Sequence, residues 1–131
     1  SGIGIACVTA QFFHCPVIFA KKNKTRNIAG DVYTSKVESF THGKVYDIIV
    51  SKDFLGPEDR VLLIDDFLAN GSALQGLIEL VRSASAELVG AGVCVEKAFQ
   101  PGGEMVRGMG VRVEALARVK SMSVEDGVVF C

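Results

Sequence analysis

The chain has 131 residues, of which 49% are hydrophobic, and it carries a formal net charge of −1 at pH 7. We expect one domain over residues 1–131, because a chain of this length and composition buries enough apolar surface for one core. A charge this close to zero gives no general attraction to nucleic acid or to an anionic membrane. No apolar run approaches the roughly 20 residues of a bilayer-spanning helix, and no secretory signal is evident. The composition therefore predicts a cytoplasmic protein with no membrane or nucleic-acid partner for this domain.

The N-terminal third predicts a helix, a short strand and a hairpin. A helix over residues 4–14 is predicted because apolar residues recur there at helical spacing: Ile5, Val8 and Phe12. Residues 17–20 predict a short buried strand, and the polar, basic stretch 21–30 predicts a loop. Residues 31–40 and 45–50 are typical of two antiparallel strands joined by a turn.

Residues 61–64 are four consecutive apolar residues, a pattern typical of a parallel strand that is covered on both faces. Asp65 and Asp66 follow directly, and adjacent carboxylates are costly in a buried strand unless they lie at its exposed C-terminal end. After a loop of small residues, helical spacing predicts a helix over residues 72–84, with its apolar face at Leu74, Leu77, Ile78 and Val81. The order strand, acids, loop and helix predicts a ligand site.

The last third continues the alternation of strand and helix. Residues 88–95 and 113–119 predict strands, and residues 103–110 predict a short helix between them. Such an alternation is typical of an α/β fold. We therefore expect a mainly parallel twisted sheet flanked by helices, with the antiparallel hairpin as an addition.

The cysteines show no metal or redox motif. Their spacing fits neither zinc ligands nor a redox pair, and three of the four lie in apolar patterns: the set is Cys7, Cys15, Cys94 and Cys131. We expect buried free thiols in a reducing compartment.

The two acids and the loop after them predict a ligand with two different ends. An acid at a strand end commonly caps the next helix, but side chains alternate along a strand, so one cap leaves the other acid pointing elsewhere. Residues 72–75 also fit a capping box that uses the Ser72 hydroxyl. The remaining free amides of the helix N-terminus attract an anion. A polyhydroxylic or metal-bearing group at Asp65 and Asp66 and a phosphate at the loop are expected.

Phosphorelay receiver domains also end a strand with two acids, but they need a third aspartate one β-α unit further on. The next aspartate after Asp66 is Asp126, so this alternative fails.

The sequence of residues 61–73, VLLIDDFLANGSA, resembles the signature of the type I phosphoribosyltransferases. Residues 95–102, VEKAFQPG, resemble the xanthine phosphoribosyltransferase branch of that family, as do residues 16–22 and 113–118. The resemblance covers nearly the whole chain. It implies the type I phosphoribosyltransferase fold with the hairpin as a lid over residues 24–40. Family members carry an N-terminal segment and a first core strand before the equivalent of Ser1, so we expect a core domain that lacks both.

The resemblance implies transfer of the 5-phosphoribosyl group from phosphoribosyl pyrophosphate to a 6-oxopurine, above all xanthine, in purine salvage. Asp65 and Asp66 would be the catalytic residues that meet the ribose hydroxyls. The 5′-phosphate would be held by Ala69, Asn70, Gly71, Ser72 and Ala73. Magnesium would arrive on the phosphoribosyl pyrophosphate, with no metal site of the protein's own.

The pyrophosphate would be held by residues from two segments: Ser1, Gly2, Lys21, Lys22 and Lys24. In the family this basic region often reaches the site across a dimer interface, so a homodimer is expected. A Ser-Gly turn before a helix is common, and a lysine cluster is usually a solvated charge run. Lys21 also replaces the arginine more usual there, which weakens bidentate contact to phosphate.

The purine would be selected by Lys97 and stacked by Phe99. A lysine ammonium only donates hydrogen bonds, so it favours an oxygen at the purine 6-position over an amino group. An ion pair of Lys97 with Glu96 and a core position for Phe99 are the structural alternatives. Two other functions stay open: a non-catalytic domain that senses phosphoribosyl pyrophosphate in a purine regulator, and an inactive truncated core.

Overall fold

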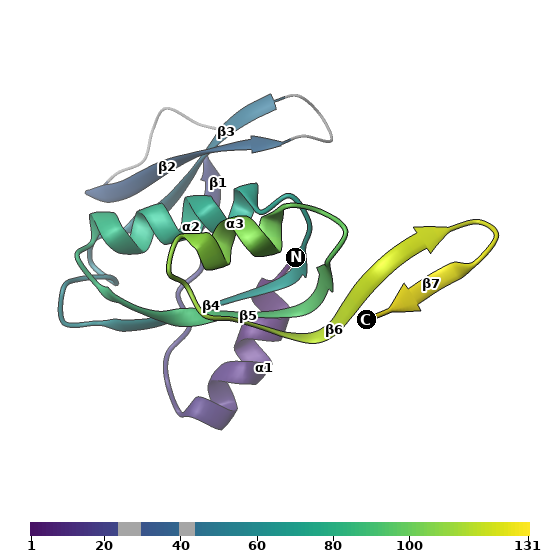
Figure 1. Ribbon diagram of the computed structural model, residues 1–131. Coiled ribbons are helices and arrows are strands. Elements are labelled where there is room, and N and C mark those ends of the chain that lie inside the picture. The colour runs from purple at the N-terminus through teal and green to yellow at the C-terminus, as the bar shows by residue number, and fades with distance from the viewer. Residues whose placement is uncertain (24–29, 40–43) are drawn as a thin grey trace.

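A computed structural model describes residues 1–23, 30–39 and 44–131 (Figure 1). The elements in chain order are α1 (Ile3–Phe13), β1 (Lys21–Asn23), β2 (Val32–Ser39), β3 (Lys44–Ser51), β4 (Arg60–Leu68), α2 (Ser72–Ser83), β5 (Glu87–Lys97), α3 (Gly102–Gly108), β6 (Val113–Ser123) and β7 (Gly127–Phe130). Helices α1, α2 and α3 and strands β4, β5 and β6 confirm the predicted elements with small shifts of their ends. None of the helices in these ranges combines the length and the apolar run that crossing a bilayer requires.

The larger sheet has the strand order β4-β5-β6-β7. Strands β4, β5 and β6 are parallel, and β7 returns antiparallel to β6. Helices α2 and α3 cover one face of this sheet, and α1 lies on the opposite side near β4 (Figure 1). The mainly parallel α/β sheet is thereby confirmed, and the C-terminal ends of β4 and β5 lie side by side.

The core lies between the parallel sheet and the two helices that cover it. Ile78 and Val106 are fully buried there, against Leu63 and Val93 from the sheet. The predicted apolar face of α2 accounts for this packing, because Leu74, Ile78 and Val81 all point into it.

The other face of the parallel sheet is open in the described residues. Leu62 is 38% exposed, Val89 45% and Leu116 89%. The expectation that the central strand is covered on both faces is therefore wrong for this part of the chain. Helix α1 contributes little cover, since its predicted apolar stripe includes Val8 and Phe12, which are 58% and 82% exposed.

The smaller sheet has the order β1-β3-β2, and all its pairs are antiparallel. The predicted hairpin is confirmed as β2 and β3, and Val37 of β2 is buried where the sheet packs against α2. The predicted strand over residues 17–20 is wrong: the strand forms over Lys21–Asn23 instead, where β3 offers a partner edge. Lys24 and most of the predicted loop lie outside the described residues, as do residues 40–43 of the predicted turn and part of the lid.

Two further expectations are corrected. Strand β7 forms an exposed ribbon with the end of β6 that projects from the body (Figure 1), and the sequence reading missed it. The cysteines are unpaired but not buried, since Cys94 is half-buried and the other three are exposed. The apolar neighbours of those three belong to α1, the segment after it and the ribbon, where the described residues provide little cover.

Candidate active site

The acidic pair lies near the C-terminal end of β4, as predicted, with the strand continuing to Leu68. The carboxylate of Asp65 accepts a hydrogen bond from the Asp66 amide at 2.9 Å, and Asp66 accepts one from the Phe67 amide at 2.9 Å. Each carboxylate therefore turns back toward the following amide. Both remain half-buried beside the chain's first residues.

Ser1 and Gly2 meet the acidic pair, so the structure brings these four predicted site residues together. A Cβ added to Gly2 would lie 2.7 Å from Asp65 Oδ1 and 2.9 Å from Asp65 Cα. Only glycine permits such a close approach of the start of α1 to β4 without a shift of the backbone. The N-terminal end of α1 thus faces the acids.

The pKa values of the two aspartates are shifted in opposite directions. Burial is the main effect on Asp65 and raises the pKa of its carboxyl above the ordinary 3.8. Hydrogen bonding to Ser1 is the main effect on Asp66 and lowers its pKa. One acid is thereby held firmly as an anion, while its neighbour binds a proton more readily.

The predicted phosphate loop forms a tight turn between β4 and α2. Gly71 has φ +87°, a left-handed conformation that favours glycine, and it occupies the cap position of α2. Asn70 Oδ1 accepts the Ser72 amide at 3.1 Å. The predicted capping box is wrong, because Ser72 is already the first helical residue and the cap position is occupied by Gly71, which has no side chain.

Among the described residues, nothing accepts a hydrogen bond from the amides of Ala73 and Leu74. Such amides at the first turn of a helix are the usual donors to a bound phosphate. The loop and helix start therefore keep donors available at the same end of the sheet as the acids.

Lys97 lies at the end of β5, next to the strand with the acids. Its Nζ lies 5.7 Å from the centre of the Phe67 ring, a cation–π contact. Phe67 is 54% exposed and Phe99 is 48% exposed, so neither ring is a core residue. Phe67 was not among the site residues predicted from the sequence. Its place directly after the acidic pair was the available signal.

The alternative of an ion pair between Glu96 and Lys97 is wrong. Glu96 pairs instead with Arg107 at 2.6 Å and with Arg118 at 3.0 Å. Consecutive residues of a strand point to opposite faces, which directs the two side chains apart. In the described part of the chain, no carboxylate lies within salt-bridge distance of Lys97, so its ammonium is available to a ligand.

Lys21 and Lys22, the described members of the basic cluster, lie in strand β1 of the smaller sheet. Lys21 Nζ lies 5.6 Å from the ring centre of Phe19, and Lys22 Nζ lies 4.3 Å from that of Tyr46. Within the described residues, no ion pair joins either lysine to Asp65 or Asp66. The pyrophosphate role of this cluster stays a prediction, and its third lysine, Lys24, lies outside the described residues.

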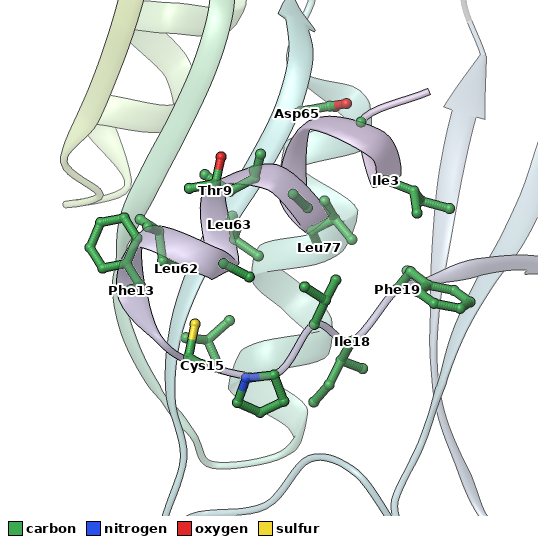
Figure 2. Close-up of a pocket in the computed structure, with 18 of the residues that line it drawn as sticks. Ile3, Thr9, Phe13, Cys15, Ile18, Phe19, Leu62, Leu63, Asp65 and Leu77 are labelled. Atoms are coloured by element: carbon green, nitrogen blue, oxygen red, sulfur yellow. The ribbon is translucent and has the colours of Figure 1, made fainter.

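A groove of about 620 Å³ lies between α1, residues 15–20 and β4, with Asp65 at one end of it (Figure 2). Successive residues 59–65 all line it, although their side chains alternate between the two faces of the sheet. The edge of β4 therefore faces the groove. Its remaining lining is mostly apolar and includes Ile3, Phe13, Ile18 and Leu77.

The described residues gather no cluster of three or more metal-ligating side chains. Asp65 and Asp66 are hard oxygen donors of the kind that share a magnesium ion with substrate phosphates. The donor set therefore suits a cation that arrives with a ligand.

Two curated proteins match the chain over almost its whole length. The chain is 61% identical over 129 residues to the xanthine phosphoribosyltransferase of Lachnoclostridium phytofermentans. The aligned region covers 98% of the chain and 66% of that protein. The chain is 55% identical over 130 residues to the xanthine phosphoribosyltransferase of Bifidobacterium adolescentis, over 98% of the chain and 67% of that protein. The chain belongs to the xanthine phosphoribosyltransferase family.

The chain spans about two thirds of the length of these family members. No family model matches it. Among solved structures, the adenine phosphoribosyltransferase of Thermoanaerobacter pseudethanolicus matches with a TM-score of 0.78, over 89% of the chain and 64% of that structure, at 19% identity. The expected type I phosphoribosyltransferase fold is confirmed.

Proposed function

We propose that the protein transfers the 5-phosphoribosyl group from phosphoribosyl pyrophosphate to xanthine in purine salvage. The observation that carries this proposal is the meeting of Asp65, Asp66, the phosphate loop and Gly2 at one end of β4. The identity of 61% to a protein named xanthine phosphoribosyltransferase supports it.

The proposed reaction breaks the bond between the ribose C1 and the pyrophosphate and forms one to a purine nitrogen. Positive charge develops on the sugar as the pyrophosphate leaves, so a nearby anion stabilises the transition state. The lowered pKa of Asp66 suits this electrostatic role. The raised pKa of Asp65 suits a residue that shares a proton with a ribose hydroxyl.

The 5′-phosphate is proposed to bind at Ala69, Asn70, Gly71, Ser72 and Ala73, where amides at the start of α2 remain available. Holding the phosphate fixes the sugar relative to the acids, and such orientation is a large part of catalysis for two-substrate reactions. Magnesium, bound to the pyrophosphate, would neutralise the charge of the leaving group.

The purine is proposed to lie beside Lys97. The ammonium contacts no carboxylate in the described residues, so it can donate to the oxygen at the purine 6-position. Phe67 and Phe99 both present exposed rings near this strand end. We assign Phe67 to the base site because its ring already contacts Lys97, and Phe99 remains a second candidate for stacking.

The complete enzyme is proposed to contain a further core strand in the groove beside β4. The groove runs along the edge of that strand and is lined by apolar side chains, as a site for one more strand would be. We also propose a homodimer in the cytoplasm, in which Ser1 and Gly2 of one subunit and the basic cluster at Lys21, Lys22 and Lys24 of the other hold the pyrophosphate.

The test is turnover by the full-length protein with phosphoribosyl pyrophosphate, magnesium and each purine base, followed by release of pyrophosphate. We expect xanthine to be the best substrate, guanine and hypoxanthine to follow, and adenine to be the poorest. Binding of phosphoribosyl pyrophosphate without turnover of any base would favour the sensor domain of a regulator instead. Equal turnover of adenine and xanthine would reject the proposed substrate.

A further inference from the structure

Glu96 is the one carboxylate buried among the described residues, with a side chain only 2% exposed. It lies at the end of β5, directly before Lys97. Arg107 of α3 donates to both its oxygens, at 2.6 Å and 2.9 Å, and Arg118 of β6 donates at 3.0 Å. The ion pair therefore ties three elements together next to the proposed base site.

Two glycines at the start of α3 allow this arrangement. A Cβ added to Gly103 would collide with Glu96 Oε1 and would lie 2.8 Å from Arg107 Nη1. A residue with a side chain at that position would thus push the carboxylate away from α3. The tight fit of Gly103 means that the position of α3 depends on the Glu96 ion pair.

Gly102 makes the corresponding contact on the opposite side, against the phosphate loop. Its amide donates to the Ala69 carbonyl at 3.0 Å. A Cβ at Gly102 would collide with that carbonyl and lie 2.5 Å from the Gly71 nitrogen. The start of α3 therefore packs directly against the backbone that forms the loop.

The loop depends on this contact in return. A Cβ on Gly71 would lie 2.6 Å from Met105 Cε and 2.9 Å from Gly102 Cα. The left-handed turn at Gly71 is thus enclosed by α3. A continuous series of contacts runs from the residue before Lys97, through the ion pair and the two glycines, to the phosphate loop.

We propose that the Glu96–Arg107 ion pair is a positioning device that sets the geometry of the phosphate loop and couples it to the purine-reading end of β5. This inference rests on the proposed function for the roles of Lys97 and residues 69–73. A buried ion pair adds little net stability compared with well-packed apolar residues. Its main consequence here is geometric, because the bidentate contact fixes both the distance and the orientation of α3.

The test compares Glu96→Gln, Arg107→Lys and Gly102→Ala in the full-length protein. The matched control is Glu87→Gln, which removes an exposed ion pair of 3.0 Å with Arg60 at the other end of β5. The first measurement is the amide NMR signals of Gly71, Ser72 and Ala73 in the ligand-free protein. The second is the calorimetric affinity for phosphoribosyl pyrophosphate with magnesium, below the melting temperature of every variant.

We expect Glu96→Gln to shift the three amide signals and to weaken the affinity roughly tenfold to a hundredfold, as a small displacement of positioning groups does. Arg107→Lys keeps the charge but loses the bidentate contact, so its affinity should also be lower than that of the wild type. The control should leave signals and affinity unchanged. If Glu96→Gln fails to fold, Arg107→Lys carries the same test, because Gly102→Ala disturbs the loop backbone directly.

A double-mutant cycle of Glu96→Gln with Gly102→Ala adds a second criterion. Residues of one device give a combined loss smaller than the sum of the single losses. Unchanged amide signals in a folded Glu96→Gln protein, or strictly additive losses, would overturn the proposal. Absence of phosphoribosyl pyrophosphate binding by the wild type would overturn the proposed function instead, and the amide signals would still decide whether the ion pair positions the loop.

Discussion

The neighbouring strands β4 and β5 both carry carboxylates near their C-terminal ends, but the pKa values of Asp65 and Glu96 are shifted in opposite directions. Asp65 on β4 is half-buried, and burial raises its pKa. Glu96 on β5 is only 2% exposed, yet the Arg107 guanidinium lowers its pKa. A nearby cation from the same chain therefore affects the pKa of a carboxyl group more than its depth of burial does, because a close opposite charge outweighs desolvation.

The comparison separates a carboxylate that serves the fold from carboxylates that remain for a ligand. Glu96 has its hydrogen bonds satisfied by Arg107 and Arg118. Asp65 and Asp66 have no lysine or arginine within salt-bridge distance among the described residues. The end of β4 is thus a place where a bound cation would balance the charge of the acids and sugar hydroxyls could donate hydrogen bonds to them.

The largest effect is expected from Asp65→Asn combined with Asp66→Asn. We expect loss of productive phosphoribosyl pyrophosphate binding and a fall in kcat/KM of about a thousandfold or more, because charge stabilisation at the sugar is removed. The fold should remain intact, since the asparagine side-chain oxygens can still accept the hydrogen bonds of the Asp66 and Phe67 amides. Calorimetry, steady-state kinetics and thermal melting measure the three quantities.

Asp126→Asn is the control for that experiment, because Asp126 lies in the exposed ribbon and bonds only to Ser123 in the described residues. Unchanged affinity in the double variant would rule out contact between the acids and the ribose.

A smaller effect is expected from Lys97→Ala, which tests the base-reading side of β5. Removing one polar contact from a site that hydrogen-bonds its substrate costs about 1–3 kcal/mol. The variant should lose most of its preference among the oxopurines, while its affinity for phosphoribosyl pyrophosphate changes little. Competition assays with xanthine, guanine and hypoxanthine measure the ratio. A preserved preference would remove Lys97 from the base site.

The third prediction concerns the dependence of stability on pH, which should differ between Glu96 and Asp65. The pKa of Glu96 is lowered from its ordinary 4.5, so the ion pair stabilises the fold fully above that pH. This stabilisation is lost as the pH falls through the lowered pKa of the folded state. Glu96→Gln should therefore lower the free energy of unfolding at neutral pH by about 1–3 kcal/mol and should flatten its decline in acid.

The contribution of Asp65 to stability changes with pH in the opposite direction. Its pKa is raised from 3.8, so its contribution to stability is full below that pH and is lost as the pH rises through the raised pKa. Asp65→Asn should remove this loss. Denaturant unfolding at a series of pH values checks both variants, and parallel curves for the two would contradict the assigned environments.

The smallest effect, a partial recovery of activity, is expected from mixed dimers. Among the described residues, no lysine or arginine pairs with the acids of β4, so a second subunit is the proposed source of the basic cluster. A subunit with Lys21, Lys22 and Lys24 replaced, mixed with one carrying Asp65→Asn and Asp66→Asn, should leave one intact site per mixed dimer. Activity assays on the mixture should exceed both parents. No recovery, or full activity of a monomer, would contradict a shared site.

Local sequence patterns were enough to predict the acidic pair, the turn at Gly71 and helix α2. These features are local: apolar runs, adjacent acids and small residues within residues 61–73 specify strand, turn and helix through their periodicity. The second motif at residues 95–102 likewise predicted a functional strand end beside the first. Periodicity also predicted α1 correctly as a helix, but not its exposure.

Contacts between residues far apart in the chain could not be predicted from local patterns. Glu96 is joined to Arg107 and Arg118, which are 11 and 22 residues away, and Phe67 lies beside Lys97 of the neighbouring strand. Strand β1 forms where β3 provides an edge, and not where the apolar run lies. Such partners depend on strand register and on how helices cover a sheet, whereas a local pattern specifies only the period of its own segment.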